Sequence, residues 1–303
     1  MIKYLSMDIF NGNKLAQEKK QLLKQRASIL LEKGIKPKIV AILYEGDAGS
    51  QLYTDIKQRV AGEIGIKYER HNYSLTNGVE PVIKLIEKLN KDKKVTGIII
   101  QKPTRKSWAS ANGIEGKPKD IKKAYDLWWR LQTAKIVENK DVDGLNSSII
   151  EVIKEDKLEK NKRVLPATAR AVLEILDSAK INLTNKKIVI LGKSDLLGIP
   201  LYEYFLSKKI VVKNMGRKDL NEQVLSGQNL LDFDVVISAT GVKSLITGEM
   251  VKNGVVVIDV GEPRGDVDFE SVKNKASFIT PVPGGVGPMT VICLMENSLD
   301  LLS

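Results

Sequence analysis

The pattern of apolar and polar residues in the first half of the chain predicts alternating helices and strands. Segments that predict strands occur at 38–44, 66–74 and 95–101. Between and before them, stretches near 12–34, 50–64 and 79–91 have the length and period of amphipathic helices. Strands that alternate with helices predict a mainly parallel sheet flanked by helices.

The same pattern returns in the second half, with short β-branched runs at 186–192, 209–214, 233–241 and 254–261. Such runs predict a Rossmann-like, doubly wound parallel sheet, in which ligands bind at the carboxyl ends of the strands. We therefore expect two α/β domains with a cleft between them. The predicted first domain spans 1–146 and is completed by a C-terminal helix at 287–303, which begins with Pro at its first position. The predicted second domain spans 147–286.

The helix predicted after residue 48 carries two stripes. About 100° per residue places four apolar residues on one face, which we expect to be buried: Leu52, Ile56, Val60 and Ile64. Ser50, Tyr53 and Lys57 form a second stripe turned away from the first. This second stripe has two interpretations: Tyr53 packs beside the core while Lys57 is solvated, or both side chains face a ligand.

Residues 105–135 do not fit the alternation and have the character of an insertion. They contain all three tryptophans, Trp108, Trp128 and Trp129. Gly and Pro predict a loop in the middle, and the sequence from Asp120 to Ala134 predicts a helix with an aromatic face. The tryptophans either anchor this helix by packing or border a functional site.

Composition limits the chemistry that the chain can use. With 303 residues, 43% of them hydrophobic, the chain is long enough for two domains. One cysteine, Cys293, and one histidine, His71, exclude an internal disulfide and disfavour a metal site or a triad. Proton transfer falls to Lys, Tyr, a carboxylate or water. No signal-peptide pattern or spanning run occurs, so we expect a cytoplasmic protein without membrane contact.

The formal net charge is +11, from 48 basic and 37 acidic residues. The lysines are interleaved with acids along predicted helices, and aromatic RNA-binding signatures are lacking, so we expect no nucleic-acid partner. A small polyanionic substrate would also be attracted by this field.

The turn from Gly192 to Gly198 follows the first strand of the second set and opens a helix, where backbone N–H groups can bind phosphate. It is neither a G-x-G-x-x-G motif, because Ser194 replaces the middle Gly, nor a Walker loop, because Lys187 occupies the first Gly position. The next strand ends without the acid that binds an NAD ribose and has Arg217 there instead. Arg217 favours NADP as the cofactor, and the alternative is an ordinary surface Arg.

Three further stretches combine unusual residues: "QKP" at 101–103, "KDVDG" at 140–144 and "TPVPGGVGPMT" at 280–290. Gln101 ends a predicted buried strand, and Asp141 and Asp143 share a face of an extended segment. Each of these features also has an ordinary structural explanation in strand ends and turns. The Pro/Gly run combines a stiff backbone with close approach to a ligand.

In this order, these elements resemble the bifunctional methylenetetrahydrofolate dehydrogenase/cyclohydrolase family. The match includes Tyr-x-x-x-Lys at 53–57, Gln-x-Pro at 101–103, Asp-Val-Asp-Gly at 141–144, the turn at 192–198 and the eleven residues at 280–290. "VVVIDVG" at 255–261, followed by "GDVDF" at 265–269, adds to it.

The resemblance implies NADP-dependent oxidation of 5,10-methylenetetrahydrofolate and hydrolysis of the methenyl product to 10-formyltetrahydrofolate. It implies tetrahydrofolate derivatives, including polyglutamylated ones, as substrates, and a homodimer. The catalytic residues it implies are Lys57, Gln101, Tyr53 and Asp143. The substrate-binding residues are Tyr53, Ser50, Asp143, Pro283 and Gly284. The NADP-binding residues are Gly192, Lys193, Ser194, Gly198, Arg217, Thr168, Thr240 and Gly241; no metal is implied.

Several positions depart from the family pattern. "QKPTR" stands where the family has Gln-Leu-Pro-Leu-Pro, and "PATA" at 166–169 keeps Thr168 but loses a Cys. The family's Gly-Arg-Ser is Gly-Lys-Ser here, and its Cys-His-Ser is Asn-Met-Gly at 214–216. Two alternatives therefore stay open: a dehydrogenase whose insertion has abolished hydrolysis, and a folate- or nucleotide-binding protein without turnover.

Overall fold

The computed structural model describes residues 8–46, 48–226 and 229–302. The chain forms two compact units. One, the three-stranded unit, comprises Lys20–Ile149, Leu158–Leu165 and the residues from Leu294 on. The other, the six-stranded unit, comprises the residues up to Lys19, Ile150–Lys157 and Pro166–Cys293. Helices α1 (Gly12–Glu32) and α11 (Val286–Asp300) contribute residues to both.

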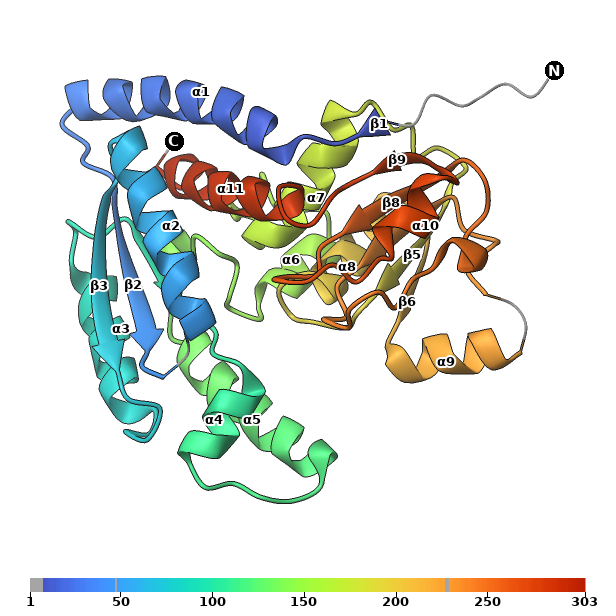
Figure 1. Cartoon of the computed structure of the whole chain (residues 1–303). Helices are drawn as coiled ribbons and strands as arrows, with labels where there is room; N and C mark the ends of the chain where they lie inside the picture. Colours follow the sequence, from blue (N-terminus) through green and yellow to red (C-terminus); the bar gives the residue numbers. More distant parts are fainter. Residues whose placement is uncertain (1–7, 47, 227–228, 303) are drawn as a thin grey trace. The chain divides into compact units, whose positions relative to one another are not determined.

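The three-stranded unit has a parallel sheet in the order β3-β2-β4. Its strands are β2 (Lys38–Tyr44), β3 (Lys67–Tyr73) and β4 (Gly97–Ile100), and helices α2 (Ala48–Ile64) and α3 (Glu80–Lys91) connect them. Six of the seven residues of β2 and all of β4 are buried, which explains why both read as continuous apolar runs. The predicted strands and helices of this half are confirmed (Figure 1).

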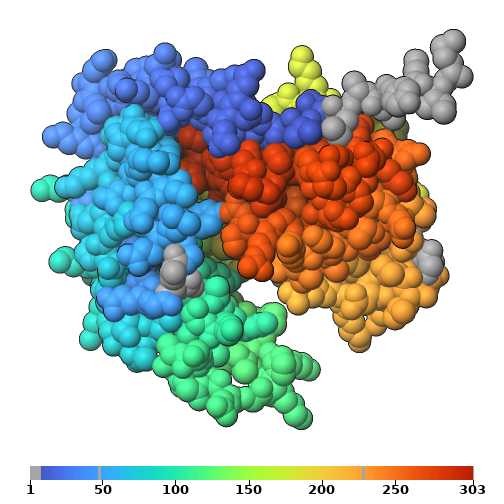
Figure 2. Space-filling model, viewed as in Figure 1, coloured from blue at the N-terminus to red at the C-terminus, as the bar shows by residue number. Residues whose placement is uncertain are grey.

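After β4 the chain forms α4 (Arg105–Ala111) and α5 (Pro118–Thr133), which we call the α4–α5 hairpin. Thr104 caps α4 by accepting a hydrogen bond from the Ser107 amide, and Pro118 opens α5. The helix predicted from Asp120 is confirmed as α5, whereas α4 was not predicted. The hairpin forms a protrusion of the three-stranded unit, green in Figure 2. A short 3₁₀ helix (Glu138–Lys140) and α6 (Ile149–Lys154) follow.

The six-stranded unit has a parallel sheet in the order β1-β9-β8-β7-β5-β6. Its strands are β1 (Asp8–Ile9), β5 (Lys187–Leu191), β6 (Val211–Met215), β7 (Val235–Ser238), β8 (Val255–Asp259) and β9 (Ala276–Ile279). Its helices are α7 (Ala167–Ser178), α8 (Gly198–Ser207), α9 (Arg217–Leu225), α10 (Phe269–Lys273) and a 3₁₀ helix (Gly248–Met250), with the first part of α11.

The four predicted strands of this unit are confirmed as β5 to β8, and the doubly wound α/β class is confirmed. Strands β1 and β9 were missed: β1 has only two residues, and β9, with the sequence ASFI, lacks the β-branched run that marks β7 and β8. Helix α11 begins at Val286, so the prediction that Pro288 is the first helical residue was wrong by two positions.

The predicted domain boundaries at 146/147 and 286/287 stay a prediction, and residues 1–7 and 303 of the predicted first domain lie outside the described residues. In the structure, α11 is divided between the units after Cys293. Within the three ranges that the structure describes, no helix combines the length and the hydropathy that a membrane crossing requires.

The predicted buried stripe of α2 was wrong. Leu52 is 62% exposed, and Ile56 and Val60 are only half-buried. The buried face consists instead of Ser50, Thr54, Lys57, Ala61 and Ile64, spaced four, three, four and three residues apart. Polar groups on this face are hydrogen-bonded: the Thr54 hydroxyl donates to the Ser50 carbonyl and the Lys57 amine donates to Gln101. Because these groups have hydrogen-bond partners, their burial does not carry the full desolvation penalty. A polar face of α2 can therefore be the buried one, which is why a prediction from apolar residues alone chose the wrong face.

All three tryptophans pack in one aromatic cluster. Trp128 contacts Trp108, Trp129, Tyr125 and Tyr44, with ring centroids 5.0–6.4 Å apart. Each tryptophan is at most 8% exposed. The packing interpretation of these residues is therefore confirmed.

Lys140 is a buried lysine that caps the C-terminus of α3. Its Nζ donates to the carbonyl oxygens of Leu89, Asn90 and Asp92, at 2.8, 2.9 and 2.8 Å. These carbonyls lie at the C-terminus of α3, where backbone acceptors lack helical partners and a cation is favoured by the helix dipole. Burial lowers the pKa of the Lys140 amine, and the charge of Asp92 opposes this shift.

Lys140→Met should therefore destabilise the protein, because three carbonyls lose their donor. We expect the free energy of unfolding to fall by about 2–4 kcal/mol in urea titrations. Lys123→Met, at an exposed position of α5, is the control and should change it by less than about 0.5 kcal/mol. Equal free energies of unfolding for the two variants would show that the cap on α3 formed by Lys140 does not stabilise the protein.

Candidate active site

The three-stranded unit brings two of the predicted catalytic residues into contact. The Nζ of Lys57, on the buried face of α2, donates to Oε1 of Gln101 at 2.9 Å. Gln101 follows β4, and its backbone amide continues the sheet by donating to the Ile42 carbonyl at 2.8 Å. Lys57 is 7% exposed. Burial lowers the pKa of its amine, and the charge of Asp143 opposes this shift.

The other predicted residues of this half lie around the same contact. Asp143 is half-buried, and it lies close enough to Lys57 for its charge to raise the pKa of the lysine amine. Tyr53 is half-buried on α2, four residues before Lys57 and therefore on the same side of the helix. Ser50 is buried, and its hydroxyl donates to the Lys102 carbonyl at 3.5 Å. The interpretation of Lys57 as a solvated lysine is thus wrong.

Asp141 shapes the loop that carries Asp143. Its two carboxylate oxygens accept hydrogen bonds from the amides of Leu145 and Asn146, each at 2.8 Å. Burial raises the pKa of the Asp141 carboxyl to about 6, and the two backbone hydrogen bonds oppose the shift. Asp141 is a structural residue of this loop, whereas Asp143 stays near Lys57.

In the six-stranded unit, the turn between β5 and α8 has the geometry of a phosphate-binding loop. A Cβ on Gly198 would lie 1.9 Å from the Gly192 carbonyl oxygen, and one on Gly192 would lie 2.5 Å from the Ala239 carbonyl oxygen. Gly192 also has a φ of +121°. Only glycine fits both positions, so the backbone at the start of α8 can approach a ligand closely.

The loop after β7 is fixed by a buried carboxylate. Oδ2 of Asp266 accepts hydrogen bonds from the Ser238 hydroxyl and from the amide and hydroxyl of Thr240. Arg217, at the first residue of α9, donates to the Thr240 carbonyl at 3.1 Å. Arg217, Thr240 and Gly241 are therefore brought together at the carboxyl end of the sheet, as predicted for cofactor-binding residues.

An ion pair joins the β5–α8 turn to α9. Lys193 Nζ lies 2.6 Å from Oδ2 of Asp219, which also accepts a hydrogen bond from the Gly216 amide at 2.8 Å. Asp219 was missed at the sequence level because it follows the strand end by four residues. The sequence feature that could have indicated Asp219 was its position two residues after Arg217, a predicted cofactor-binding residue. Ser194 stabilises the turn, since its hydroxyl accepts from the Gly198 amide at 3.3 Å.

The remaining predicted residues have separate positions. Pro283 and Gly284 lie between β9 and α11 in the six-stranded unit, and the Gly284 carbonyl accepts a hydrogen bond from the Gly12 amide at 2.9 Å. The predicted substrate-binding residues are thus divided between the two units. Thr168 is half-buried in the first turn of α7.

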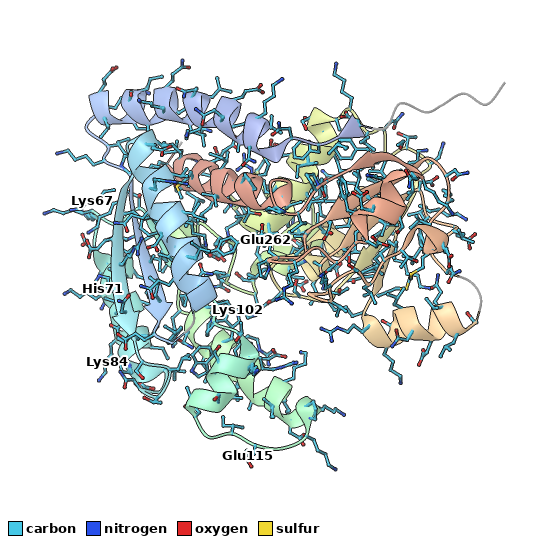
Figure 3. All side chains as sticks on the ribbon, in the orientation of Figure 1. Lys67, His71, Lys84, Lys102, Glu115 and Glu262 are labelled. Atoms are coloured by element: carbon cyan, nitrogen blue, oxygen red, sulfur yellow. The ribbon has the colours of Figure 1, made fainter. Side chains whose placement is uncertain are left out.

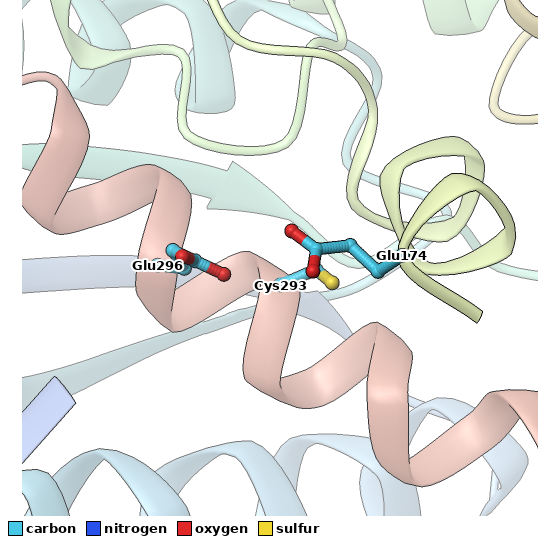
Figure 4. A group of neighbouring side chains, drawn as sticks. All are labelled: Glu174, Cys293 and Glu296. Atoms are coloured by element: carbon cyan, nitrogen blue, oxygen red, sulfur yellow. The ribbon is translucent and has the colours of Figure 1, made fainter. Parts of the chain in front are cut away.

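Figure 4 shows Glu174 of α7 beside Cys293 of α11, with Glu296 one turn further along the same helix. A carboxylate oxygen of Glu174 and the Cys293 sulfur lie within 4.8 Å of each other. Glu174 already forms ion pairs with Lys19 at 2.6 Å and with Arg170 at 3.3 Å. A carboxylate between two cations is a poor metal ligand, so this group gives no reason to propose a metal.

The fold and these sites define a class of protein: an α/β enzyme with a dinucleotide-binding unit and a second unit that presents a buried lysine. The family model "Tetrahydrofolate dehydrogenase/cyclohydrolase, catalytic domain" matches residues 10–116. The model for the NAD(P)-binding domain of the same family matches residues 166–303. Neither match includes residues 117–165, which contain α5 and Asp143.

Individual relatives agree with the family models. The chain is 34% identical to "Bifunctional protein FolD" of Mesoplasma florum, over 97% of each chain. It is 36% identical to the protein of the same name from Lactobacillus delbrueckii, over 97% of this chain and 96% of the other. The crystal structure of the bifunctional enzyme FolD from Campylobacter jejuni superposes with a TM-score of 0.84 at 31% identity and 98% coverage of both chains.

The FolD structure from Trypanosoma brucei, described as complexed with NADP cofactor and inhibitor, has a TM-score of 0.82 at 26% identity, over 97% of each chain. The chain belongs to the tetrahydrofolate dehydrogenase/cyclohydrolase family. The resemblance inferred from the sequence motifs is thereby confirmed.

The raised pKa of Asp141 predicts a specific pH dependence of stability. The unfolded chain loses this proton at about pH 4, whereas the folded chain keeps it to about pH 6. Between these values the folded state binds more protons, so the contribution of Asp141 to stability falls as the pH rises, by up to about 3 kcal/mol.

Urea titrations from pH 4 to pH 7 should detect this fall as a change in the stability difference between the protein and Asp141→Asn. Burial also raises the pKa of Asp259 to about 6, but Asp259 is present in both proteins and cancels in the difference. A difference that stays constant over this pH range would contradict the assignment. A constant offset is expected in addition, because Asn offers one acceptor oxygen in place of two.

Proposed function

We propose that the chain carries out both reactions of its family: oxidation of 5,10-methylenetetrahydrofolate and hydrolysis of the methenyl product to 10-formyltetrahydrofolate. The observation that carries the proposal is the hydrogen bond between the buried amine of Lys57 and Gln101. Hydrolysis needs a proton acceptor, and a lysine whose pKa is lowered by burial suits this role better than a solvated lysine.

In the hydrolytic step, water adds to the cationic methenyl carbon and loses one proton. The bond from that carbon to N5 then breaks as N5 takes up a proton and the added hydroxyl loses its remaining one, which leaves the formyl group on N10 and releases one proton overall. The Lys57 amine is proposed to orient the water and accept its proton. The positive charge of the methenyl substrate would depress the pKa of Lys57 further and favour the neutral amine. Gln101 holds the amine in place through its carbonyl oxygen.

The proposed folate contacts come from the predicted substrate-binding residues. Asp143 offers two acceptor oxygens to the amino-pyrimidine edge of the pterin, and Tyr53 offers a ring for stacking. Ser50 shapes the segment after Gln101 through its bond to Lys102. Pro283 and Gly284 would contact the substrate through backbone groups of a stiff turn.

The proposed cofactor is NADP, which supplies the hydride acceptor for the oxidation. The turn formed by Gly192, Lys193, Ser194 and Gly198 would bind the diphosphate at the start of α8, and Arg217 would bind the 2′-phosphate. Thr240 and Gly241 would contact the cofactor from the loop that Asp266 fixes. Thr168, in the first turn of α7, is proposed as a further contact.

The hairpin does not separate the proposed catalytic residues, since Lys57 and Gln101 remain within hydrogen-bond distance. This contact favours retention of hydrolysis over a dehydrogenase alone or a binding protein without turnover.

We further propose a homodimer, polyglutamylated folates as substrates and a cytoplasmic site of action. The edge strand β6, where Val211 is 63% exposed, is consistent with a second copy covering it. The excess of lysine suits a polyanionic tail.

Lys57→Met should separate the two activities. Hydride transfer depends mainly on holding two rings in register, whereas hydrolysis needs the amine itself. We expect hydrolysis of methenyltetrahydrofolate, followed by absorbance, to fall by about 100-fold or more while dehydrogenase activity remains measurable. Met has a similar volume and suits the buried position, so the variant should fold, as circular dichroism would show.

Lys67→Met is the matched control, because Lys67 is exposed on β3 and is labelled in Figure 3. It should leave both activities unchanged. If Lys57→Met hydrolyses its substrate at the parental rate, the role proposed for the amine is wrong.

Cofactor preference should respond in opposite directions to two changes in α9. Arg217→Ala removes a cation and should narrow the preference for NADP over NAD by about 1–3 kcal/mol. Asp219→Asn removes a carboxylate that would repel a 2′-phosphate and releases Lys193 from its ion pair, so it should widen the preference. The measurement is kcat/KM with each cofactor; equal use of both by the parent protein would refute the NADP assignment.

A further inference from the structure

The position of Gln101 depends on a short segment outside the sheet. Its amide makes the last hydrogen bond to β2, and Lys102 and Pro103 then lead directly to Thr104, which caps α4. Beyond Gln101, therefore, β2 no longer fixes the backbone. Because Lys102 and Pro103 lie outside the strand, contacts from other elements to this segment bear on the orientation of the Gln101 side chain.

Helix α5 supplies such contacts. The Tyr125 hydroxyl donates a hydrogen bond to the Pro103 carbonyl. The Lys102 amine lies 4.8 Å from the centre of the Trp129 ring and 5.7 Å from that of Tyr125, within the range of cation–π attraction. Figure 3 labels Lys102, where the hairpin meets the segment after β4. Helix α5 thus contacts both residues that follow Gln101.

Helix α5 is itself held to the sheet at a different point. The hydroxyl of Tyr44, the last residue of β2, donates to Oε1 of Gln132, and the Tyr44 ring lies 5.0 Å from that of Trp128. Tyr125 and Trp129 are 6% and 1% exposed. A helix whose aromatic face is buried and fixed to β2 can therefore act as a rigid support for the segment Gln101–Pro103.

We propose that Tyr125 is a positioning residue for the hydrolytic step: it holds the Pro103 carbonyl, and with Trp129 and Lys102 it keeps Gln101 within hydrogen-bond distance of Lys57. This inference rests on the function proposed for Lys57. The hairpin then has a catalytic purpose beyond its own packing, although none of its residues touches the reacting atoms.

The physical reason is the directionality of the amine. The bond to Gln101 takes one N–H of Lys57 and so fixes the directions of the remaining positions on nitrogen, including the lone pair of the neutral form. A displacement of about 1 Å in a catalytic group costs up to about 100-fold in rate. A partial loss of orientation should therefore lower kcat and leave substrate binding largely intact.

Tyr125→Phe tests this inference, since it removes one oxygen and keeps the ring. We expect kcat for methenyltetrahydrofolate hydrolysis to fall by about 5- to 50-fold, with KM changed by less than about twofold. Thr133→Val is the matched control: it removes another buried hydroxyl of α5, one that donates to the Trp129 carbonyl within the helix and not to β2 or residues 101–103. Its kcat should stay within about twofold of the parent.

A second pair of variants tests the segment directly. Lys102→Arg keeps a cation over the rings and should preserve kcat, whereas Lys102→Met should lower it by about threefold or more. This pair decides the question if Tyr125→Phe fails to fold.

The outcomes distinguish a failure of the proposed function from a failure of the positioning role. A parent protein without hydrolytic activity would refute the proposed function and with it this inference. If the parent is active and the kcat of Tyr125→Phe is unchanged, or falls no further than the kcat of Thr133→Val, the positioning role alone is overturned.

Discussion

A buried amine is the main constraint on the three-stranded unit. Lys57 lies on the face of α2 that packs inward, and its amine donates to the side-chain amide oxygen of Gln101 at the end of β4. Removing a charged amine from water is unfavourable, so burial lowers the pKa of Lys57. The same burial that costs stability provides the chemistry, which requires α2 and β4 to be held accurately.

Much of the surrounding structure serves this accuracy. Asp141 orders the loop of Asp143 through two backbone amides, and Lys140 joins the start of that loop to the C-terminus of α3. The hairpin follows Gln101 in the chain, and the hydroxyl of its Tyr125 donates a hydrogen bond to the Pro103 carbonyl in the segment after Gln101. These residues are not proposed to touch the substrate, but they limit the movement of those that are.

The six-stranded unit follows a different principle, because the ligand-binding groups proposed for it are mainly backbone. Gly192 and Gly198 are required where strand and helix approach too closely for a Cβ. Asp266 orders the loop after β7 by accepting three hydrogen bonds on one oxygen. Side-chain charge enters at α9, where Arg217 and the Lys193–Asp219 pair define the electrostatic environment offered to a cofactor.

The sequence by itself determined the class of fold, the family and the order of the elements, because strands buried on both faces are continuous apolar runs and the motifs are long and specific. It also identified Lys57, Gln101 and Asp143, which lie in three separate motifs. Tertiary structure alone decided that Lys57 is buried, since the inward face of α2 is chosen by hydrogen-bond partners on β4 rather than by apolarity. It also decided the roles of Tyr125 and Asp219, because their partners at Pro103 and Lys193 are distant in sequence and no local pattern encodes those contacts.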